Sequence, residues 1–415
     1  MAWLTLPVFA VLAVLHTQSL TQPGAFMVHA QDLPRQAQVI DQKSFNVWPS
    51  GLVPPSTVAN GSQIFAPPGI STDDLHAKPF HVYDDEFYSI IGTNPTLTLL
   101  AETASDPVYH EAVVWYEPTD EVFFVQNAGA PAAGTGLNKS GIIQKISLSQ
   151  VEGLTNLTNA TGQVTVDLVS SNPTIVNPTG ATNYRGQLVY LAEGAGPDNT
   201  SELVALNPLE PYNSTVVLNN YFGRQFSSVN DVAIHPVNQD IYFTDTLYGF
   251  LQDFRPAPGL RNQVYRWNDR TGAVTIVADG FNLPNGIAFS PDGAYAYVSD
   301  TGTNKGYYGF NYSDPASIYR YDVKSDGTFD NRKTFAFVDS GVPDGVHTDS
   351  NGNVYTGAGD GLQVWNPSGK LVGKIYLGTT SANFAFAGHG RLVICAETKL
   401  YYATLNATGW IPEGN

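Results

Sequence analysis

A short structural unit recurs six times along the chain and constrains the fold more than any other feature. In each copy a polar residue opens an apolar strand, a tight turn follows, and a second strand ends in a small or acidic residue. The clearest copies run from Pro284 to Asp300 and from Pro343 to Ala358, and the others open at Glu111, Asn177, Asn230 and Asn383. The copies lie about 50 residues apart, a spacing typical of propeller blades. We therefore predict an all-β fold, a six-bladed β-propeller with four-stranded blades.

The six copies account for residues 96–415, so we predict a single propeller domain over this range. In the fourth blade, alternating apolar residues and Gly-containing turns predict strands over 285–290, 295–300, 317–323 and 334–339. The last blade supplies only three strands, and the run from Leu97 to Glu102 can provide the fourth, so that an N-terminal strand closes the ring. Cys395 is the only cysteine, so a disulfide cannot close it. Helical periodicity is largely absent, and we expect little helix.

The N-terminus resembles a targeting segment. The run from Leu4 to Leu15 is apolar but too short to cross a bilayer comfortably, and Val28-His29-Ala30 fits a small-residue cleavage site, with a cut between 17 and 20 as the alternative. We predict a signal peptide over residues 1–30 and an N-terminal extension over residues 31–95 that packs on the propeller. Eight Asn-X-Ser/Thr sequons favour a secreted, extracellular glycoprotein; they are at Asn60, Asn138, Asn156, Asn159, Asn199, Asn213, Asn311 and Asn406.

The net charge of −17 at pH 7 and the pI near 4.7 restrict the partners. Nucleic-acid binding needs clusters of Lys and Arg that neutralise phosphates, so the acidic balance argues against a nucleic-acid partner. No basic amphipathic segment suggests membrane binding. A small-molecule partner fits this composition, and the oligomeric state is left open.

The residues that open the repeats are candidates for the chemistry. In a propeller the first strands of all blades start at one end of the central channel, so their opening residues become neighbours. Glu111, Asn230, Asn285 and Asp344 would then supply two carboxylates and two amide oxygens, a hard oxygen cage suited to Ca²⁺. Zinc fits less well, because no cluster of His and Cys ligands is present. The alternative is that the Asn-Gly and Asp-Gly pairs only shape turns, but this does not account for Glu111.

Four motifs at blade spacing resemble those of the SMP-30/gluconolactonase/regucalcin-like family of six-bladed propellers. They are His110-Glu111-Ala112-Val113-Val114-Trp115, Val229-Asn230-Asp231, Leu283-Pro284-Asn285-Gly286 and Val342-Pro343-Asp344-Gly345. The stretches 123–131 and 220–226 look like the secreted fungal lactonohydrolases, which open aldonolactones and D-pantoyl lactone. The resemblance implies that Glu111, Asn285 and Asp344 are Ca²⁺ ligands, and that Asn230 is a fourth ligand or a substrate contact. Regucalcin-type members carry an arginine where this chain has Ser228, so sugar-lactone contacts inferred from that arginine do not transfer.

A lactone hydrolase of this kind needs a polarised carbonyl and a base that takes a proton from the attacking water. Ca²⁺ would polarise the carbonyl. Asp344 is the first candidate for the base and Asp231 the second, and Glu111 completes the catalytic carboxylates. Whether a second, structural Ca²⁺ lies deeper in the channel is left open. The candidate substrate contacts are Asn230, Ser228, His110, Tyr248 and Tyr307.

Two further expectations concern the surroundings of the site. His110 and His347 each lie an odd number of positions from the ligand of their blade, so strand alternation predicts that both point away from the channel. The connections 246–262 and 301–316 are long and should emerge at the ligand end, where they would wall a substrate pocket.

These features predict a secreted Ca²⁺-dependent lactonase, a carboxylic ester hydrolase that acts on small hydroxylated lactones. One alternative is an arylesterase-like or organophosphatase-like hydrolase on the same metal site, which substrate profiling would distinguish. The other is a binding or calcium-storage propeller without catalysis, because propellers host many unrelated functions. Loss of activity in a folded Glu111→Gln variant would count against this last alternative.

Overall fold

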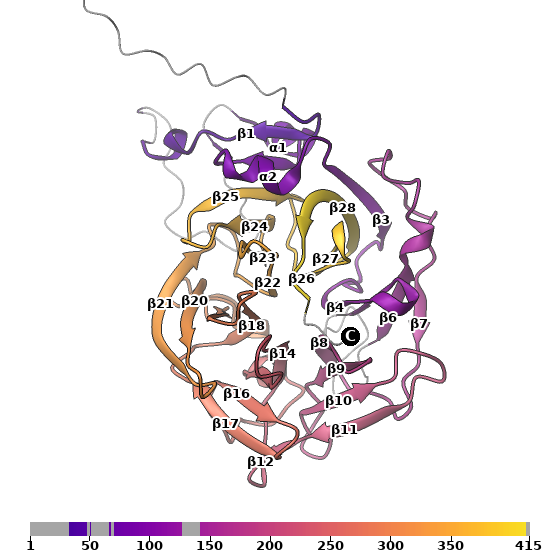
Figure 1. Cartoon of the computed structure of the whole chain (residues 1–415), viewed down its shortest axis with the longest axis vertical. Helices are drawn as coiled ribbons and strands as arrows, with labels where there is room; N and C mark the ends of the chain where they lie inside the picture. The colour runs from indigo at the N-terminus through magenta and orange to yellow at the C-terminus, as the bar shows by residue number, and fades with distance from the viewer. Residues whose placement is uncertain (1–32, 48–49, 51–65, 68–69, 127–141, 412–415) are drawn as a thin grey trace, which may run out of the picture. The chain divides into compact units, whose positions relative to one another are not determined.

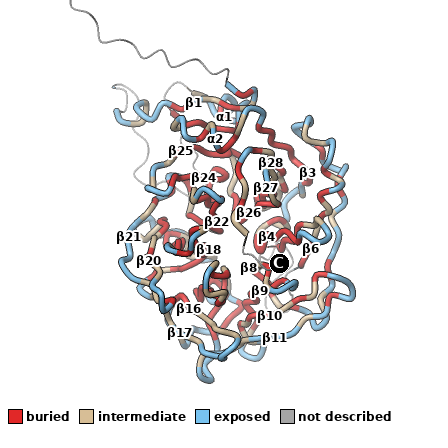
Figure 2. The backbone as a smooth tube through the Cα atoms, viewed as in Figure 1, coloured by how far each residue is buried: buried red, intermediate tan, exposed pale blue. Residues whose placement is uncertain are grey.

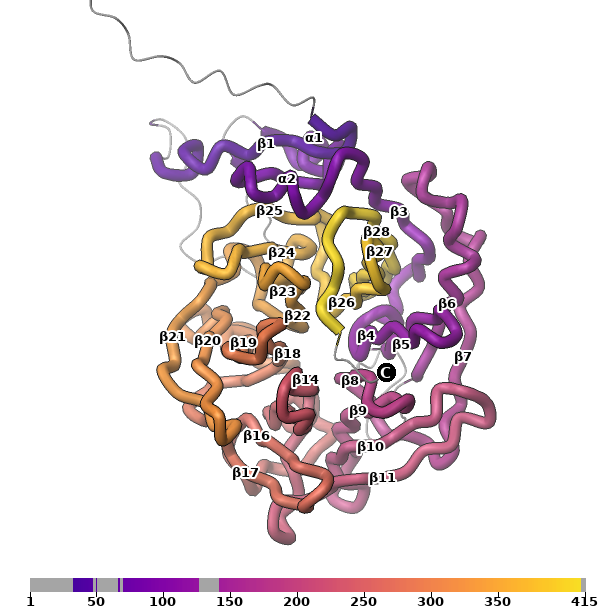
Figure 3. Tube along the Cα trace, in the orientation of Figure 1, coloured from indigo at the N-terminus to yellow at the C-terminus, as the bar shows by residue number. Residues whose placement is uncertain are grey.

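Six four-stranded antiparallel arrays surround a central channel in the described part of the computed structural model, and each array is one propeller blade (Figure 1). The structure describes residues 33–47, 50, 66–67, 70–126 and 142–411. The blades follow one another around the ring in chain order, with the first strand of each nearest the channel (Figure 3). This arrangement confirms the predicted six-bladed fold.

The strands of the first three blades have the following bounds. Blade 1 comprises β4 (Glu111–Tyr116), β5 (Glu121–Val125), β6 (Ile143–Ser147) and β7 (Asp167–Val169). Blade 2 comprises β8 (Pro178–Tyr184), β9 (Gln187–Ala192), β10 (Glu202–Leu206) and β11 (Ser214–Leu218). Blade 3 comprises β14 (Val229–Ile234), β15 (Ile241–Asp245), β16 (Gln263–Asn268) and β17 (Ala273–Ala278). A hairpin of β12 (Asn220–Tyr221) and β13 (Arg224–Gln225) precedes blade 3.

The remaining blades complete the ring. Blade 4 comprises β18 (Pro284–Phe289), β19 (Tyr295–Asp300), β20 (Ser317–Val323) and β21 (Phe329–Phe337). Blade 5 comprises β22 (Val346–Thr348), β23 (Val354–Ala358), β24 (Gly361–Trp365) and β25 (Leu371–Tyr376). Blade 6 comprises β26 (Asn383–Phe386), β27 (His389–Ala396), β28 (Lys399–Thr408) and β3 (Thr96–Glu102).

Strand β3 closes the ring as predicted. It pairs antiparallel with β28, with Leu97 opposite Ala403 and Thr96 opposite Thr404. The two threonine hydroxyl oxygens lie 2.7 Å apart. The edge of blade 6 is therefore paired with sequence from the other end of the propeller rather than left open.

In blade 4 the second and third predicted strands match the structure, and the first differs by one residue at each end. The predicted bounds of the fourth strand were wrong, because β21 begins at Phe329 rather than Thr334. The added residues are mostly polar and exposed on the outermost strand of the blade. An outer strand has little apolar alternation to reveal it, whereas its backbone pairing with β20 is continuous in space.

The hydrophobic core is divided among the contacts between neighbouring blades. Each of the six large clusters of buried residues draws on two successive blades, for example Phe243 and Tyr265 of blade 3 in contact with Leu191 and Leu203 of blade 2. Buried residues accordingly line the inner strands, and exposed residues lie along the outer strands (Figure 2). Each blade thus buries its apolar faces against its neighbours, which holds the channel-facing residues in fixed positions.

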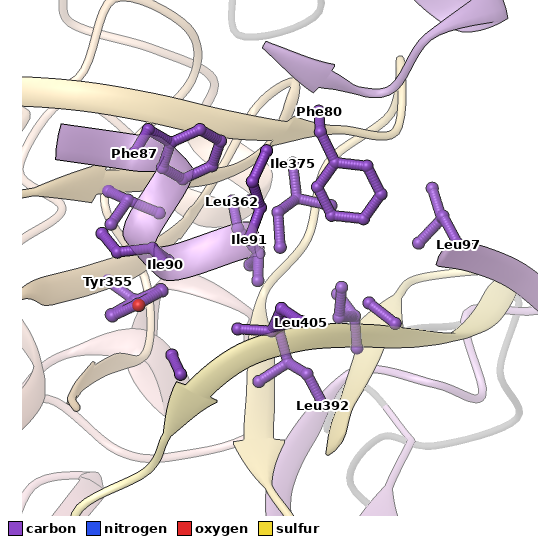
Figure 4. Close-up of a cluster of buried hydrophobic side chains, with 14 of the residues drawn as sticks. Phe80, Phe87, Ile90, Ile91, Leu97, Tyr355, Leu362, Ile375, Leu392 and Leu405 are labelled. Atoms are coloured by element: carbon purple, nitrogen blue, oxygen red, sulfur yellow. The ribbon is translucent and has the colours of Figure 1, made fainter. Parts of the chain in front are cut away.

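The residues that precede the ring pack on blades 5 and 6. Strand β1 (Ala37–Val39) pairs with β2 (Phe80–Val82), which pairs with β25 and extends blade 5 to six strands. Helix α2 (Glu86–Ile91) places Phe87, Ile90 and Ile91 in the cluster drawn in Figure 4. Residues Pro34–Asn415 form one compact unit. The predicted signal peptide lies outside the described residues.

Helices are short, as expected. Besides α2 they are η1 (Gln42–Phe45), α1 (Thr72–Ala77), η2 (Glu117–Thr119), η3 (Leu148–Gln150), α3 (Tyr248–Leu251) and η4 (Gly306–Tyr308). No helix within the described ranges has the length and apolar character needed to cross a membrane.

Candidate active site

The four residues predicted as metal ligands line one pocket at the mouth of the channel. Glu111, Asn230 and Asn285 are buried, with 3–5% of their surface exposed, and Asp344 is half-buried. The pocket has a volume of about 80 Å³, enough for a few water molecules. Side chains that are separated by more than 200 residues in the sequence therefore share one site.

A bulge lies at the channel end of the inner strands that carry Glu111, Asn230 and Asn285. The pairing register shifts between Glu111 and Val114 in blade 1, and at the corresponding points of blades 2, 3 and 4. Ala112, directly after Glu111, has a φ of 51°. A bulge bends its strand and redirects a side chain that regular alternation would send elsewhere.

Hydroxyl groups from each preceding blade hold the backbone of three of these positions. Thr179 of blade 2 donates to the carbonyl of Asn230 at 2.9 Å. Thr244 of blade 3 donates in the same way to Asn285 at 2.8 Å. Ser299 of blade 4 donates to Asp344 at 2.8 Å. The ligand positions are thus fixed by contacts between blades, not by their own strands alone.

Two aspartates at the ends of the second strands hold the loops that enter the inner strands. Asp245 accepts the N–H groups of Ser227 and Ser228 at 3.1 and 2.8 Å. Asp300 accepts those of Asn282 and Leu283 at 3.0 and 2.9 Å. Both aspartates therefore orient the backbone immediately before Asn230 and Asn285.

The glycines of the opening motifs permit close approach of the blades. A Cβ on Gly286 would lie 2.4 Å from the carbonyl oxygen of Asp344, and one on Gly180 would lie 2.4 Å from that of Asn230. A Cβ on Gly345 would lie 2.5 Å from the Asn383 side chain. None of these three glycines adopts the left-handed conformation. The Asn-Gly and Asp-Gly pairs are therefore explained by packing between blades and not by turn geometry.

The oxygen atoms at the centre of the site have few hydrogen-bond donors. Asn230 Oδ1, Asn285 Oδ1 and Asp344 Oδ1 are buried without a hydrogen-bond partner among the described residues. Glu111 Oε2 accepts a hydrogen bond from Asn383 Nδ2 at 2.9 Å. Buried acceptors are rarely left without a partner, and a set of carboxylate and amide oxygens is the donor set that Ca²⁺ takes. These residues fit a hard cation.

The electrostatics of the site also favour a cation. Burial and the Asp344 carboxylate raise the pKa of Glu111 to about 8. Burial raises the pKa of Asp344 to about 6, against the opposing effect of protonated His110. Two carboxylates that share a buried site disfavour ionisation of both, and a divalent cation would relieve this repulsion. Among the described residues, no group of three or more His, Cys, Asp or Glu is arranged to hold a metal.

His110 also lines the pocket, so the prediction that it points away was wrong. It lies just before β4 at the bulge, where strand alternation does not apply. Its Nδ1 is 3.0 Å from Glu397 Oε1. Burial opposes protonation, but the carboxylates around it, with Glu397 first among them, raise the pKa of His110 to about 10.

His347 is absent from the lining of this pocket, although it does reach the channel. It lines two small cavities with Trp410 and with residues of several inner strands that follow the pocket residues along the chain, such as Ala181 and Thr182. Burial lowers the pKa of His347 to about 4. The prediction that it turns away from the channel was therefore wrong, although it does lie away from the ligand pocket.

The other predicted site residues fall into two groups. Tyr248 lines the pocket, whereas Ser228 and Tyr307 do not. Ser228 is buried behind the wall, and Tyr307 is 46% exposed on η4. Asp231 also lies outside the lining, and its Oδ1 and Oδ2 accept the N–H groups of Val232 and Ile287 at 2.8 and 2.9 Å. Asp231 therefore connects blades 3 and 4, which contradicts its prediction as an alternative base.

Several pocket residues were not predicted from the sequence. Thr179 occupies the position in blade 2 that Asn230 occupies in blade 3, since Pro178 pairs with Ala192 as Val229 pairs with Asp245. Glu193, directly after β9, contributes a third carboxylate. Gln252 and Asn304 come from the two long connections, which wall the pocket as predicted. The sequence signal for Thr179 is its Pro-X-Gly motif, Pro178-Thr179-Gly180, which matches Pro284-Asn285-Gly286 and Pro343-Asp344-Gly345.

Known proteins share parts of this sequence and fold. Residues 199–398 match the family model of the SMP-30/Gluconolactonase/LRE-like region. Lactonohydrolase oryL of Aspergillus oryzae is 30% identical over 350 residues, which cover 79% of this chain and 74% of that protein. A gluconolactonase structure from Xanthomonas campestris matches with a TM-score of 0.60 at 22% identity, covering 79% of this chain and 95% of that one. Regucalcin from Agrobacterium tumefaciens, described as a calcium-binding protein, matches with a TM-score of 0.50 at 15% identity, covering 77% of this chain and 99% of that one.

Proposed function

Because the chain belongs to the SMP-30/gluconolactonase/LRE-like family, we propose that it opens small hydroxylated lactones, aldonolactones and D-pantoyl lactone among them, with Ca²⁺ as its cofactor. Its lactonohydrolase and gluconolactonase relatives are carboxylic ester hydrolases, and the chain is a lactonase of this class. The observation that carries the proposal is the set of three buried, unpaired oxygens beside Glu111 in one pocket.

Glu111, Asn230, Asn285 and Asp344 would hold the cation, in agreement with the calcium-binding neighbour regucalcin. When bound, Ca²⁺ would supply Lewis acidity toward the lactone carbonyl. Asn383 holds Glu111 in place through its 2.9 Å hydrogen bond to Oε2. The cross-blade hydroxyl contacts of Thr179, Thr244 and Ser299 keep the other three positions fixed, which lowers the reorganisation required during reaction.

We assign the proton transfers to Asp344. Water attacks the carbonyl carbon and loses a proton to the carboxylate of Asp344, the ring C–O bond breaks, and the proton passes to the ring oxygen, which becomes the hydroxyl of the product acid. Asp344 lines the pocket, and its carboxylate has a second oxygen besides the one that would contact the cation, so one oxygen is left to accept the proton. No covalent intermediate with a protein nucleophile is required.

The character of the pocket favours hydroxylated substrates over the arylesterase or organophosphatase alternative. The described lining is polar apart from Pro178 and the ring of Tyr248, and it contains the carboxyl groups of Glu111, Glu193 and Asp344. Such a wall offers hydrogen bonds to hydroxyl groups and little apolar surface to an aryl group. The hydrolase relatives also favour an enzyme over a purely binding propeller.

We further propose that the protein is a secreted glycoprotein. The proposal rests on the apolar N-terminal segment and on the exposure of every sequon in the described residues, namely Asn156, Asn159, Asn199, Asn213, Asn311 and Asn406. The sequons at Asn60 and Asn138 lie outside the described residues. Peptide mapping of protein recovered from culture medium, before and after removal of N-glycans, would test both parts. Retention of residues 1–30 would contradict secretion through a cleaved signal.

The central test is hydrolysis of D-glucono-1,5-lactone and D-pantoyl lactone by pH-stat, with native enzyme, with EGTA, and after Ca²⁺ is added back. We expect turnover that EGTA abolishes and Ca²⁺ restores, with calorimetry giving the number of bound ions. The Glu111→Gln variant should retain the circular dichroism spectrum of the native protein and lose at least about 100-fold in kcat/KM. Unchanged activity in this variant would reject the site assignment. Turnover of neither lactone by the Ca²⁺-loaded protein would reject the substrate class.

A further inference from the structure

Glu193 is a pocket carboxylate that the proposed mechanism leaves without a role. It follows β9 in blade 2, lines the same pocket as Glu111 and Asp344, and is 1% exposed. A buried carboxylate is costly unless hydrogen bonds satisfy it. The two carboxylate oxygens of Glu193 therefore need hydrogen-bond donors, which can come from the protein or from the pocket.

The protein satisfies one oxygen of Glu193. The hydroxyl of Ser228 donates to Glu193 Oε1 and accepts the backbone N–H of Gly249 at 2.9 Å. A serine hydroxyl has one proton, and because its acceptor site takes the Gly249 N–H, that proton is directed to Glu193. Ser228, buried behind the pocket wall, thus fixes the orientation of the carboxyl group.

The other oxygen of Glu193 has no hydrogen-bond partner among the described residues. Glu193 Oε2 makes no hydrogen bond with the described residues, and it is not among the fully enclosed unpaired atoms, so it is open to the pocket. Nearby Arg255 is occupied elsewhere, since its Nη1 donates to the carbonyls of Gly196 and Asn199 at 2.7 and 2.6 Å. Oε2 is therefore placed to accept a hydrogen bond from a donor in the pocket.

The chemistry of a lactone identifies that donor. Its carbonyl and ring oxygens are acceptors only and cannot donate to Oε2, whereas a ring hydroxyl can. We propose that Glu193, oriented by Ser228, accepts a hydrogen bond from a ring hydroxyl of the substrate and thereby selects hydroxylated lactones over unsubstituted ones. This inference rests on the proposed lactonase function and assigns a specificity residue to its pocket.

The test compares D-glucono-1,5-lactone with δ-valerolactone, which has the same ring size and no hydroxyl groups, at saturating Ca²⁺. In Glu193→Gln and Glu193→Ala we expect the ratio of the two kcat/KM values to fall by about 10- to 100-fold, mainly through a higher KM for the hydroxylated lactone. Ser228→Ala should lower the ratio in the same direction by a smaller factor. Glu202→Gln is the matched control, because Glu202 lies in the same blade, accepts from Thr200 at 2.9 Å and is outside the pocket.

The outcomes separate this inference from the proposed function. A ratio within twofold of the native value in both folded Glu193 variants, while the native enzyme opens the hydroxylated lactone, would overturn the role of Glu193 alone. Equal losses on both lactones would also overturn it, because they would indicate an effect on the reaction or on the metal. Failure of the native enzyme to open either lactone would overturn the proposed function and this inference together.

Discussion

Replacing Gly286 with alanine should disturb the site through the backbone alone. A Cβ at this position would lie 2.4 Å from Asp344 O and 2.7 Å from Val346 N, and ordinary contact begins at 3.4 Å. The inner strands of blades 4 and 5 would therefore have to separate by about 1 Å, moving Asn285 away from Asp344. Gly286 is outside the left-handed region, so alanine would add no intrinsic backbone strain there.

The expected magnitudes differ for stability and activity. Overpacking of this kind costs about 1–3 kcal/mol. Roughly 380 residues with an unfolding entropy of about 2.1 cal/mol/K each give about 0.8 kcal/mol/K, so Tm should fall by only about 1–4 °C. A displacement of 1 Å in a catalytic site can cost about 100-fold in rate, so kcat/KM should fall by that factor in protein that is still folded.

The assay combines thermal unfolding with pH-stat lactone hydrolysis at several Ca²⁺ concentrations. Gly259→Ala is the matched control, because a Cβ on Gly259 would meet nothing within 4 Å and its φ is also outside the left-handed region. Native kcat/KM and Ca²⁺ dependence in Gly286→Ala would refute the argument that this glycine maintains ligand geometry. Equal losses in both variants would refute it as well.

Three further predictions concern the base, the metal and pH. Asp344→Asn should lower kcat by about 100- to 10,000-fold. Asp231→Asn should keep kcat within about tenfold and lose about 1–3 kcal/mol of stability in urea unfolding. A larger loss of kcat in Asp231→Asn than in Asp344→Asn would reassign the base. Ca²⁺ at about 1,000 times its Kd should add about 4 kcal/mol to the free energy of unfolding of the native protein, or about 5 °C to its Tm, and should not stabilise Glu111→Gln. An equal rise in Tm in both proteins would place the ion elsewhere. Burial, with Lys374 contributing, lowers the pKa of His81 to about 4 in the folded state, whereas His81 of the unfolded chain binds a proton near pH 6.5, so the free energy of unfolding falls as pH drops from 6.5 to 4. His81→Gln should remove about 1 kcal/mol per pH unit of this fall, measured by urea unfolding at several pH values. An unchanged slope would contradict the assignment.

Much of the site could be predicted because its residues occupy equivalent points of a repeat. Glu111 begins β4, Asn230 and Asn285 are the second residues of β14 and β18, and Asp344 lies two residues before β22. The ring brings the starts of its inner strands together, so these four side chains meet in one pocket. The hydroxyl residues that support them also have a recurring signal, since Thr244-Asp245 and Ser299-Asp300 both end second strands. A search for that dipeptide would have found their role.

The failures have a common physical cause. His110 was placed by strict alternation, which the bulge beside Glu111 interrupts. Asp231 was assigned as a base from its place beside a ligand, whereas backbone N–H groups of two blades occupy its oxygens. Ser228 was proposed as a substrate contact, but in the fold it lies behind Glu193 and positions it.

The number of blades, the closing strand and the four side chains Glu111, Asn230, Asn285 and Asp344 could be read from the chain alone, because each follows from a pattern repeated at regular spacing. Which further groups line the pocket between these four side chains follows from the three-dimensional packing of the blades. Glu193, Thr179 and His110 enter the site through bulges and contacts between neighbouring blades, which join residues that are far apart in the chain. Such contacts depend on the separation of neighbouring inner strands to within a few tenths of an ångström. Glycine allows the close separation seen here, but a periodic sequence pattern does not specify it.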